Sequence, residues 1–443
     1  MSAFVLTNWF FCIVTGTLLL MAIWRQRFLL VKPSIIVIIF FHLCIQWAAT
    51  IESDYIEIYL PDPWVFALFA QGFPLIGLLV SIWTGRRLAR ITWQRVLHPE
   101  EVSSKLRHRA ILFLAALIGI FVLFYIQVVH FSNTGLYAIF ANPSSSAVVR
   151  EESLKLVKSE LIRYGYGFMA YGFAPLLSVL LLWQVITGFK RRRWIAMLAN
   201  LSAIVGVLFV VSLTGARSFA ASIILVMAFA WFLKRGFPLN PIYMALGVLF
   251  ILAFPVLLTI LREGKIPDMI LFWNYLSGGI FQRVFYSPMQ TGLYYTHFTQ
   301  TVGFIGVSGV PKLATLFGIS PINAANYLGL LYTDTHIESV NMNTSYVFAY
   351  YCYFGIGSFV FSLFGLWLLD TVLLIYRKMS SLMLTACIAS VSIASISLIS
   401  SEYTVVLLTH GFIVILLTSV FIDRFYRSRL KRIQPPIESE PAP

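Results

Sequence analysis

Charged residues are scarce in this chain of 443 residues: Asp, Glu, Lys and Arg make up 11% of it, whereas hydrophobic residues make up 59%. Soluble globular domains carry about 25% charged and about 45–50% apolar residues. So few charges cannot cover the surface of a protein of this size in water. The composition therefore excludes an ordinary soluble protein and favours one that spans a membrane.

Acidic residues and cysteines are also few. The chain has 18 Asp and Glu against 32 Lys and Arg, a net charge of +14. A soluble protein with this excess would suggest nucleic acid, but membrane proteins retain basic residues at the cytoplasmic ends of their helices, so we expect no nucleic-acid partner. The four cysteines, Cys12, Cys44, Cys352 and Cys387, lie in apolar stretches. There they act as small hydrophobic residues and not as a disulfide framework.

Long hydrophobic runs are abundant, and a transmembrane helix needs roughly 20 such residues. The first run has no basic residue before it and Arg25 after it, which predicts a retained helix and not a cleaved signal peptide. We predict an all-α polytopic membrane protein, a single integral membrane domain over 1–443 with about eleven transmembrane helices. The predicted spans are 4–24, 33–51, 64–84, 110–131, 164–188, 194–213, 218–233, 242–261, 344–369, 382–400 and 403–422.

The basic residues are distributed unevenly between the predicted loops. If the segment after the first span is cytoplasmic, six cytoplasmic segments hold 23 of the 32 Lys and Arg residues. This asymmetry is what the positive-inside rule requires. It predicts an external (periplasmic) N-terminus and a cytoplasmic tail at 423–443.

The loop lengths predict where any chemistry takes place. No cytoplasmic segment reaches the roughly 50 residues of a domain, and the longest, 85–109, contains no glycine-rich phosphate loop. Two external segments are long. Residues 132–163 include an amphipathic stretch that could lie on the outer leaflet, and residues 262–342 form a large segment typical of a packed lid or of re-entrant elements. We therefore expect a catalytic or binding site on the external side.

External basic residues are candidates for binding an anion. Arg217 follows Gly215 and Ala216 in a short hinge between two predicted spans, and Arg262, Lys265 and Arg283 flank the start of the large external segment. Guanidinium groups bind planar oxyanions bidentately and keep their charge, so these residues could surround a pyrophosphate. The structural alternative for Arg217 is that its side chain simply extends to the membrane surface.

Candidate bases follow later in the same segment. His336 and Glu338 precede the ninth predicted span, and either side chain could take a proton from an incoming hydroxyl. They could equally be solvated loop residues. Together with Asp334 they would make a mixed ligand set within five residues, which is too weak a pattern to predict a metal.

Aromatic residues recur in the large external segment and could stack on the apolar faces of sugars. The alternative is an aromatic belt at the membrane interface. The candidate sugar-binding residues are Trp273, Tyr275, Tyr286, Tyr294 and Tyr295.

Polar residues also occur at or near predicted membrane depth, where they either form hydrogen bonds between helices or mark a site. They are His42, Gln46, Gln184, Glu402 and His410.

These features resemble one family, the Wzy-type polymerases of bacterial O-antigen and exopolysaccharide repeat units. The resemblance is carried by the turn Gly215-Ala216-Arg217, by the oversized external segment after the eighth span, and by the stretch from Asn343 to Gly357. It implies an architecture similar to C-type membrane glycosyltransferases, in the bacterial inner membrane. In some members an arginine is followed ten residues later by glycine, whereas Arg262 and Arg283 are not followed in that way here.

The resemblance implies an activity and its partners. A glycan would pass from undecaprenyl pyrophosphate onto the non-reducing end of another lipid-linked repeat unit at the periplasmic face. Arg217, Arg262 and Arg283 would hold the pyrophosphate, and no cofactor or metal would be needed. A chain-length regulator and a flippase in the same membrane are candidate partners. An O-antigen ligase, a lipid-linked oligosaccharide transporter and an acyltransferase are the alternatives.

Overall fold

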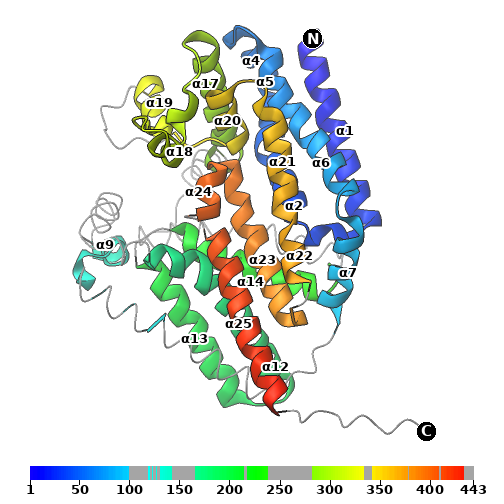
Figure 1. Cartoon of the computed structure of the whole chain (residues 1–443), viewed down its shortest axis with the longest axis vertical. Coiled ribbons are helices and arrows are strands. Elements are labelled where there is room, and N and C mark those ends of the chain that lie inside the picture. Colours follow the sequence, from blue (N-terminus) through cyan, green and yellow to red (C-terminus); the bar gives the residue numbers. More distant parts are fainter. Residues whose placement is uncertain are drawn as a thin grey trace, which may run out of the picture. The chain divides into compact units, whose positions relative to one another are not determined.

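A computed structural model of the chain describes residues 1–98, 118–119, 122, 126, 130–141, 165–213, 217–237, 282–333, 342–377, 379–408 and 411–433. Within these ranges the chain forms helices joined by turns, with no β-strand (Figure 1). The prediction of an all-α protein is thereby confirmed for the described part.

Eight helical stretches in the described ranges are long and apolar enough to cross a membrane. Seven of them coincide closely with predicted spans. The predicted span 218–233 corresponds to the shorter apolar helix Phe219–Lys234, and the predicted spans 110–131 and 242–261 lie mostly or wholly outside the described residues. The eight stretches are Ala3–Arg25, Pro33–Ile51, Pro63–Trp83, Gly165–Lys190, Trp194–Ser212, Ser358–Tyr376, Ser381–Ile399 and Tyr403–Arg424.

The predicted span 344–369 is placed differently. The chain forms α20 (Tyr346–Phe354), turns at Gly355, and continues as α21 (Ser358–Asp370) and α22 (Val372–Tyr376), so the candidate span is Ser358–Tyr376. Gly355 has φ of 73°, a left-handed conformation that ends α20 and that side chains other than glycine rarely adopt. A Cβ there would also lie 3.1 Å from the ring of Phe304. A hydropathy profile does not detect this break, because the residues on both sides of it are apolar.

The chain divides into two compact units. The first comprises Met1–Ile91, Phe237–Thr371 and Ser395–Leu407, and the second comprises Thr92–Gly236, Val372–Ala394 and Leu408–Pro443. The helices that lie in or begin in the first unit are α1 (Ala3–Arg25), α2 (Pro33–Phe41), α3 (Trp47–Ile51), α4 (Ser53–Tyr59), α5 (Pro63–Ala67), α6 (Phe73–Trp83), α7 (Arg86–Leu97), α17 (Ser287–Thr301), α18 (Pro311–Leu316), α19 (Ala324–Tyr332), α20, α21 and α24 (Tyr403–Leu408), with 3₁₀ turns at Arg27–Val31, Gly306–Gly309 and Ser397–Ile399.

The second unit contains the remaining helices. These are α9 (Gly135–Ala141), α12 (Ala174–Lys190), α13 (Trp194–Ser212), α14 (Arg217–Lys234), α22, most of α23 (Ser381–Ile396) and α25 (Phe412–Ile433), with a 3₁₀ turn at Phe131–Asn133 and a π-helix at Met169–Phe173. Close packing here depends on Gly411, which has φ of 80° and whose Cβ would collide with Tyr171.

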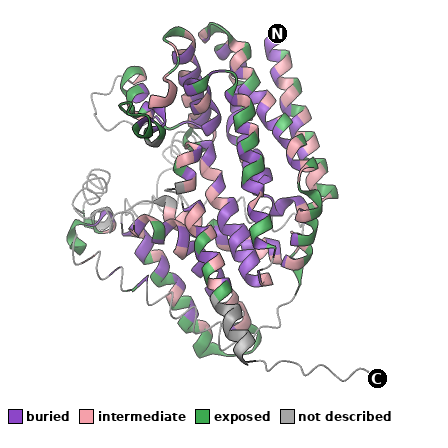
Figure 2. Cartoon of the chain, viewed as in Figure 1, coloured by how far each residue is buried: buried purple, intermediate pink, exposed green. Residues whose placement is uncertain are grey.

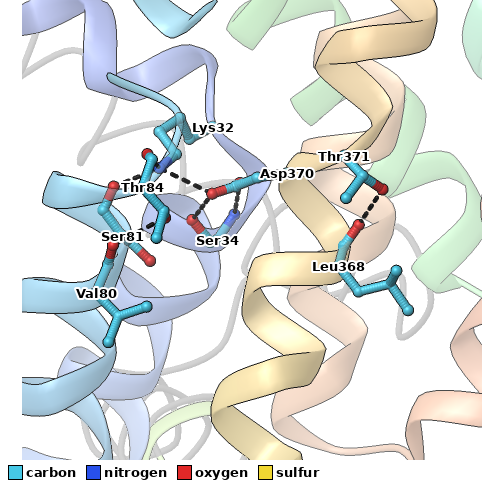
Figure 3. A network of polar contacts seen from close by, with 8 residues as sticks. All are labelled: Lys32, Ser34, Val80, Ser81, Thr84, Leu368, Asp370 and Thr371. Carbon is cyan, nitrogen blue, oxygen red and sulfur yellow. Dashed lines mark hydrogen bonds and ion pairs between the residues drawn. The ribbon is translucent and has the colours of Figure 1, made fainter. Parts of the chain in front are cut away.

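A buried ion pair joins three spans of the first unit at one end (Figure 3). Lys32 Nζ lies 2.9 Å from Asp370 Oδ2, and neither side chain is more than 8% exposed. Lys32 also donates to the carbonyl oxygens of Ser81 and of Thr84, while Asp370 accepts from the backbone N–H and the hydroxyl of Ser34. Each charge is thus paired and hydrogen-bonded, as a buried charge requires.

A second polar network lies inside these spans, where α2 continues through a π-helix (His42–Gln46) and α5 through another (Leu68–Gly72). Trp47 Nε1 donates to His42 Nε2 at 3.1 Å, so His42 Nδ1 carries the proton and donates to Gln46 Oε1 at 2.7 Å. Gln71 Nε2 donates to the hydroxyl of Thr50 at 2.9 Å. The predicted membrane-depth residues His42 and Gln46 therefore bond to other helix residues, which favours a packing role.

Candidate functional site: a tyrosine–histidine cluster

Five ring side chains from three helices of the first unit gather in one place: Tyr55 and Tyr59 on α4, Tyr294 and His297 on α17, and Tyr332 on α19. We call this set the tyrosine–histidine cluster. Its rings contact one another in series. Tyr55 stacks on Tyr59 at a centroid distance of 5.4 Å, Tyr59 lies 4.8 Å from His297, and Tyr294 stacks on Tyr332 at 4.9 Å.

The spacing of residues on α17 explains why one face of the helix packs in the core while another face contributes side chains to the cluster. Gly292, Tyr295 and Thr296 are buried, whereas Tyr294 and His297, three positions apart, are only half-buried. The buried face contacts α20 so closely that a Cβ on Gly292 would collide with the Phe348 ring. Glycine at this position therefore lets α17 lie against α20 while Tyr294 and His297 turn toward α4 and α19.

The C-terminal end of α17 is also fixed to the loop that carries α4. The side chain of Gln300 accepts from Asp62 N at 3.1 Å and donates to Asp62 O at 2.8 Å. This pair of hydrogen bonds sets the register of α17 against the segment 52–62. Because that segment joins two candidate spans, the cluster lies at the end of those spans opposite to the Lys32–Asp370 pair.

His297 and Tyr332 are the directly bonded pair of the cluster. His297 Nδ1 lies 2.7 Å from Tyr332 Oη. Partial burial raises the pKa of Tyr332 to about 12, and the neighbouring Tyr59, Cys352 and Tyr294 contribute to the rise. The phenol is therefore neutral at physiological pH. When His297 Nδ1–H donates to the phenol oxygen, the lone pair of Nε2 is left to accept a proton from a ligand.

The phenols of Tyr55 and Tyr59 in the cluster, and of Tyr286 near it, are neutral for the same reason. Burial raises the pKa values of Tyr55, Tyr59 and Tyr286, and Glu52 adds to the rise at Tyr55 and Tyr286. Gln290 Nε2 donates to the hydroxyl of Tyr294 at 3.1 Å. The cluster therefore offers aromatic faces, neutral hydroxyls and one imidazole on partly exposed side chains, a combination suited to a neutral polyhydroxylated ligand such as a sugar.

The predicted site residues fall into three groups. Tyr294 is in the cluster, and Tyr286 lies near it, whereas Tyr295 is 2% exposed and packs inside the unit. The side chain of Arg283 is exposed, and Arg217 begins α14 in the second unit. Outside the described residues lie Arg262, Lys265, Trp273, Tyr275, His336 and Glu338, whose roles remain predictions.

Two further residues bear on the sequence predictions, one in the cluster and one outside it. His297 is the residue that sequence reasoning missed, because its neighbours in the cluster, Tyr59 and Tyr332, come from other helices and no local pattern marks it. Glu402, predicted as a polar residue at membrane depth, accepts a hydrogen bond from the Tyr353 hydroxyl. Burial raises the pKa of Glu402, while the bond from Tyr353 lowers it in part. Among the described residues, no group of His, Cys, Asp and Glu is arranged to hold a metal ion.

Comparison of the chain with protein-family models, with curated proteins and with solved structures finds no match in any of the three. Its function is therefore inferred from the membrane-spanning helices and from the residues of the cluster.

Proposed function

We propose that the chain is a membrane glycosyltransferase that polymerises lipid-linked oligosaccharide repeat units. In this proposal the glycan moves from an undecaprenyl-pyrophosphate carrier to the non-reducing end of another lipid-linked unit, at the external face of a bacterial inner membrane. The observation that carries the proposal is the tyrosine–histidine cluster: neutral aromatic side chains and one imidazole, half-buried at one end of a bundle of apolar helices.

The charge distribution supports an external position for the cluster. Arg25, Arg27, Arg86 and Arg87 flank the same ends of the first three spans as Lys32, whereas the segment 52–62 carries acidic residues and no basic one. The positive-inside rule places the arginine ends in the cytoplasm. The cluster, at the opposite ends, would then face the periplasm, where no nucleotide-activated sugar is needed because the carrier lipid supplies the activated donor.

The chemistry assigns a task to each kind of side chain. An acceptor hydroxyl attacks the anomeric carbon of the donor glycan, its proton passes to His297 Nε2, and the bond from that carbon to the pyrophosphate oxygen breaks. The carrier pyrophosphate leaves with the bonding electron pair. Its growing charge would be stabilised by arginine guanidinium groups, for which Arg262 and Arg283, from the same unit as His297, are the candidates. His336 and Glu338 are the alternative bases.

The test is reconstitution. The full chain in lipid vesicles is supplied with a purified undecaprenyl-pyrophosphate repeat unit, and the products are separated by length on a gel. A ladder of lipid-linked oligomers is expected. A product formed only when a lipid A core is added would instead identify a ligase, and unchanged substrate that merely crosses the bilayer would identify a transporter.

A further inference from the structure

Residues 302–333, which follow α17, expose a largely apolar surface. Residues 302–333 contain one charged residue, Lys312. The side chains of Phe304, Leu316 and Phe317 are 62%, 76% and 66% exposed, and every residue from 315 to 323, at the end of α18 and in the turn after it, is exposed (Figure 2). Contiguous exposed apolar patches of this kind on soluble surfaces mark binding sites for another molecule or a membrane.

The segment cannot cross a membrane. Helix α18 has six residues and α19 has nine, and the backbone between them turns without regular helix over 317–323. Several turn amides bond within the segment, for example Ile319 N to Ala314 O at 2.8 Å and Ile322 N to Ser308 O at 2.8 Å. A backbone of this kind is excluded from the lipid-exposed hydrocarbon centre but is compatible with the boundary between headgroups and acyl chains.

The exposed surface of the segment continues the exposed face of a candidate span. Ile305 N donates to Cys352 O at 3.0 Å, and the Phe304 ring lies against Gly355. Ile356, directly after Gly355, is 56% exposed, and Val360, near the start of the span Ser358–Tyr376, is 68% exposed. The exposed side of a membrane span faces lipid, so the apolar surface that adjoins its end lies at the same lipid boundary.

We propose that residues 302–333, the α18–α19 segment, dip into the leaflet adjoining the tyrosine–histidine cluster and bind the lipid surface through Leu316, Phe317 and their neighbours. Tyr332, at the end of α19, belongs to the cluster, so the dipped segment holds the cluster beside the lipid headgroups. This inference requires only that the candidate spans cross a bilayer, and it does not depend on the proposed transferase activity.

The test is possible without removing the four native cysteines, because all four are buried. Single cysteines at exposed positions can therefore be labelled selectively with a nitroxide spin label. The variants are Leu316→Cys and Phe317→Cys, with Val360→Cys as the control on the span and Asp54→Cys as the control on α4. The full chain is reconstituted in vesicles of phosphatidylethanolamine and phosphatidylglycerol, and each label is exposed to oxygen, which partitions into lipid, and to a neutral nickel chelate, which stays in water.

The labels at 316 and 317 are expected to behave like the label at the Val360 control. Their ratio of oxygen collisions to nickel-chelate collisions should be several-fold higher than that of the Asp54 control. Having two neighbouring positions keeps the test valid if one variant does not fold. A nickel accessibility equal to that of the Asp54 control would show that the segment faces water and would overturn the proposal. A label shielded from both reagents would show a protein contact in place of lipid, which also overturns it.

Discussion

Removing one member of the Lys32–Asp370 pair should be among the most destabilising polar substitutions in the first unit. In Asp370→Asn the shape is kept, but Lys32, whose side chain is 0% exposed, loses its counter-charge. Loss of one partner from a buried ion pair costs about 3–5 kcal/mol, because the remaining charge stays buried and uncompensated. The two carbonyl oxygens that Lys32 also contacts, those of Ser81 and of Thr84, are dipoles and do not replace a carboxylate.

The size of the effect can be tested with a double-mutant cycle. Lys32→Met and Asp370→Leu are each expected to lower the free energy of unfolding by about 3–5 kcal/mol, and the double variant by much less than the sum, since no charge is left buried. The measurement is unfolding of the purified protein in mixed micelles, followed by circular dichroism.

The matched control is Thr371→Val. Thr371 directly follows α21, and its hydroxyl donates an exposed hydrogen bond to the carbonyl oxygen of Leu368 in that helix, so its loss should change the free energy of unfolding by about 0.5 kcal/mol or less (Figure 3). If Asp370→Asn were no more destabilised than this control, or if the two single effects simply added, the pair would not be a coupled buried ion pair.

Three further predictions concern the site and its support. Tyr332→Phe removes the hydroxyl that bonds His297 at 2.7 Å but keeps the stacked ring, so it should slow glycan elongation about tenfold without unfolding the protein. An unchanged elongation rate with the lipid-linked substrate would show that this hydrogen bond does not contribute to the activity. Burial raises the pKa of Glu402, so the protonated carboxyl stabilises the fold at low pH, and this contribution is lost as pH rises from about 4.3 through the raised pKa. The melting temperature of Glu402→Gln should therefore increase relative to that of the wild type as pH rises. A difference in melting temperature that is constant with pH would contradict this. Gly292→Val would force a side chain into the Phe348 ring and should cost about 1–3 kcal/mol of unfolding free energy, whereas a melting temperature equal to that of the wild type would show that α17 can move away.

The span pattern could be predicted from composition because a bilayer demands long apolar runs and tolerates few charges within them. Seven of the eight candidate spans lie within a few residues of the predicted ones. The span after α20 was misplaced, because the break depends on the left-handed conformation of Gly355 and on its contact with Phe304, and neither changes hydropathy.

The partners of polar residues could not be predicted. Lys32 is one of the basic residues that predict a cytoplasmic segment after the first span, yet it is buried against Asp370. Ser34 and Asp370 are 336 positions apart, and no local pattern brings them together. His297 was missed for the same reason, since its significance arises from Tyr59 on α4 and Tyr332 on α19. Tyr294, in contrast, was predicted as an aromatic of the external segment.

The most direct test of the central claim is elongation by the His297→Ala protein in vesicles with a purified undecaprenyl-pyrophosphate repeat unit, beside a Tyr327→Phe control. Tyr327 lies on the same helix as Tyr332 but contacts Phe298 through its ring, which phenylalanine preserves. The account predicts that His297→Ala slows elongation by about 10²–10⁴-fold, as the loss of a general base does, while the control makes the wild-type ladder. A wild-type ladder from His297→Ala would contradict it.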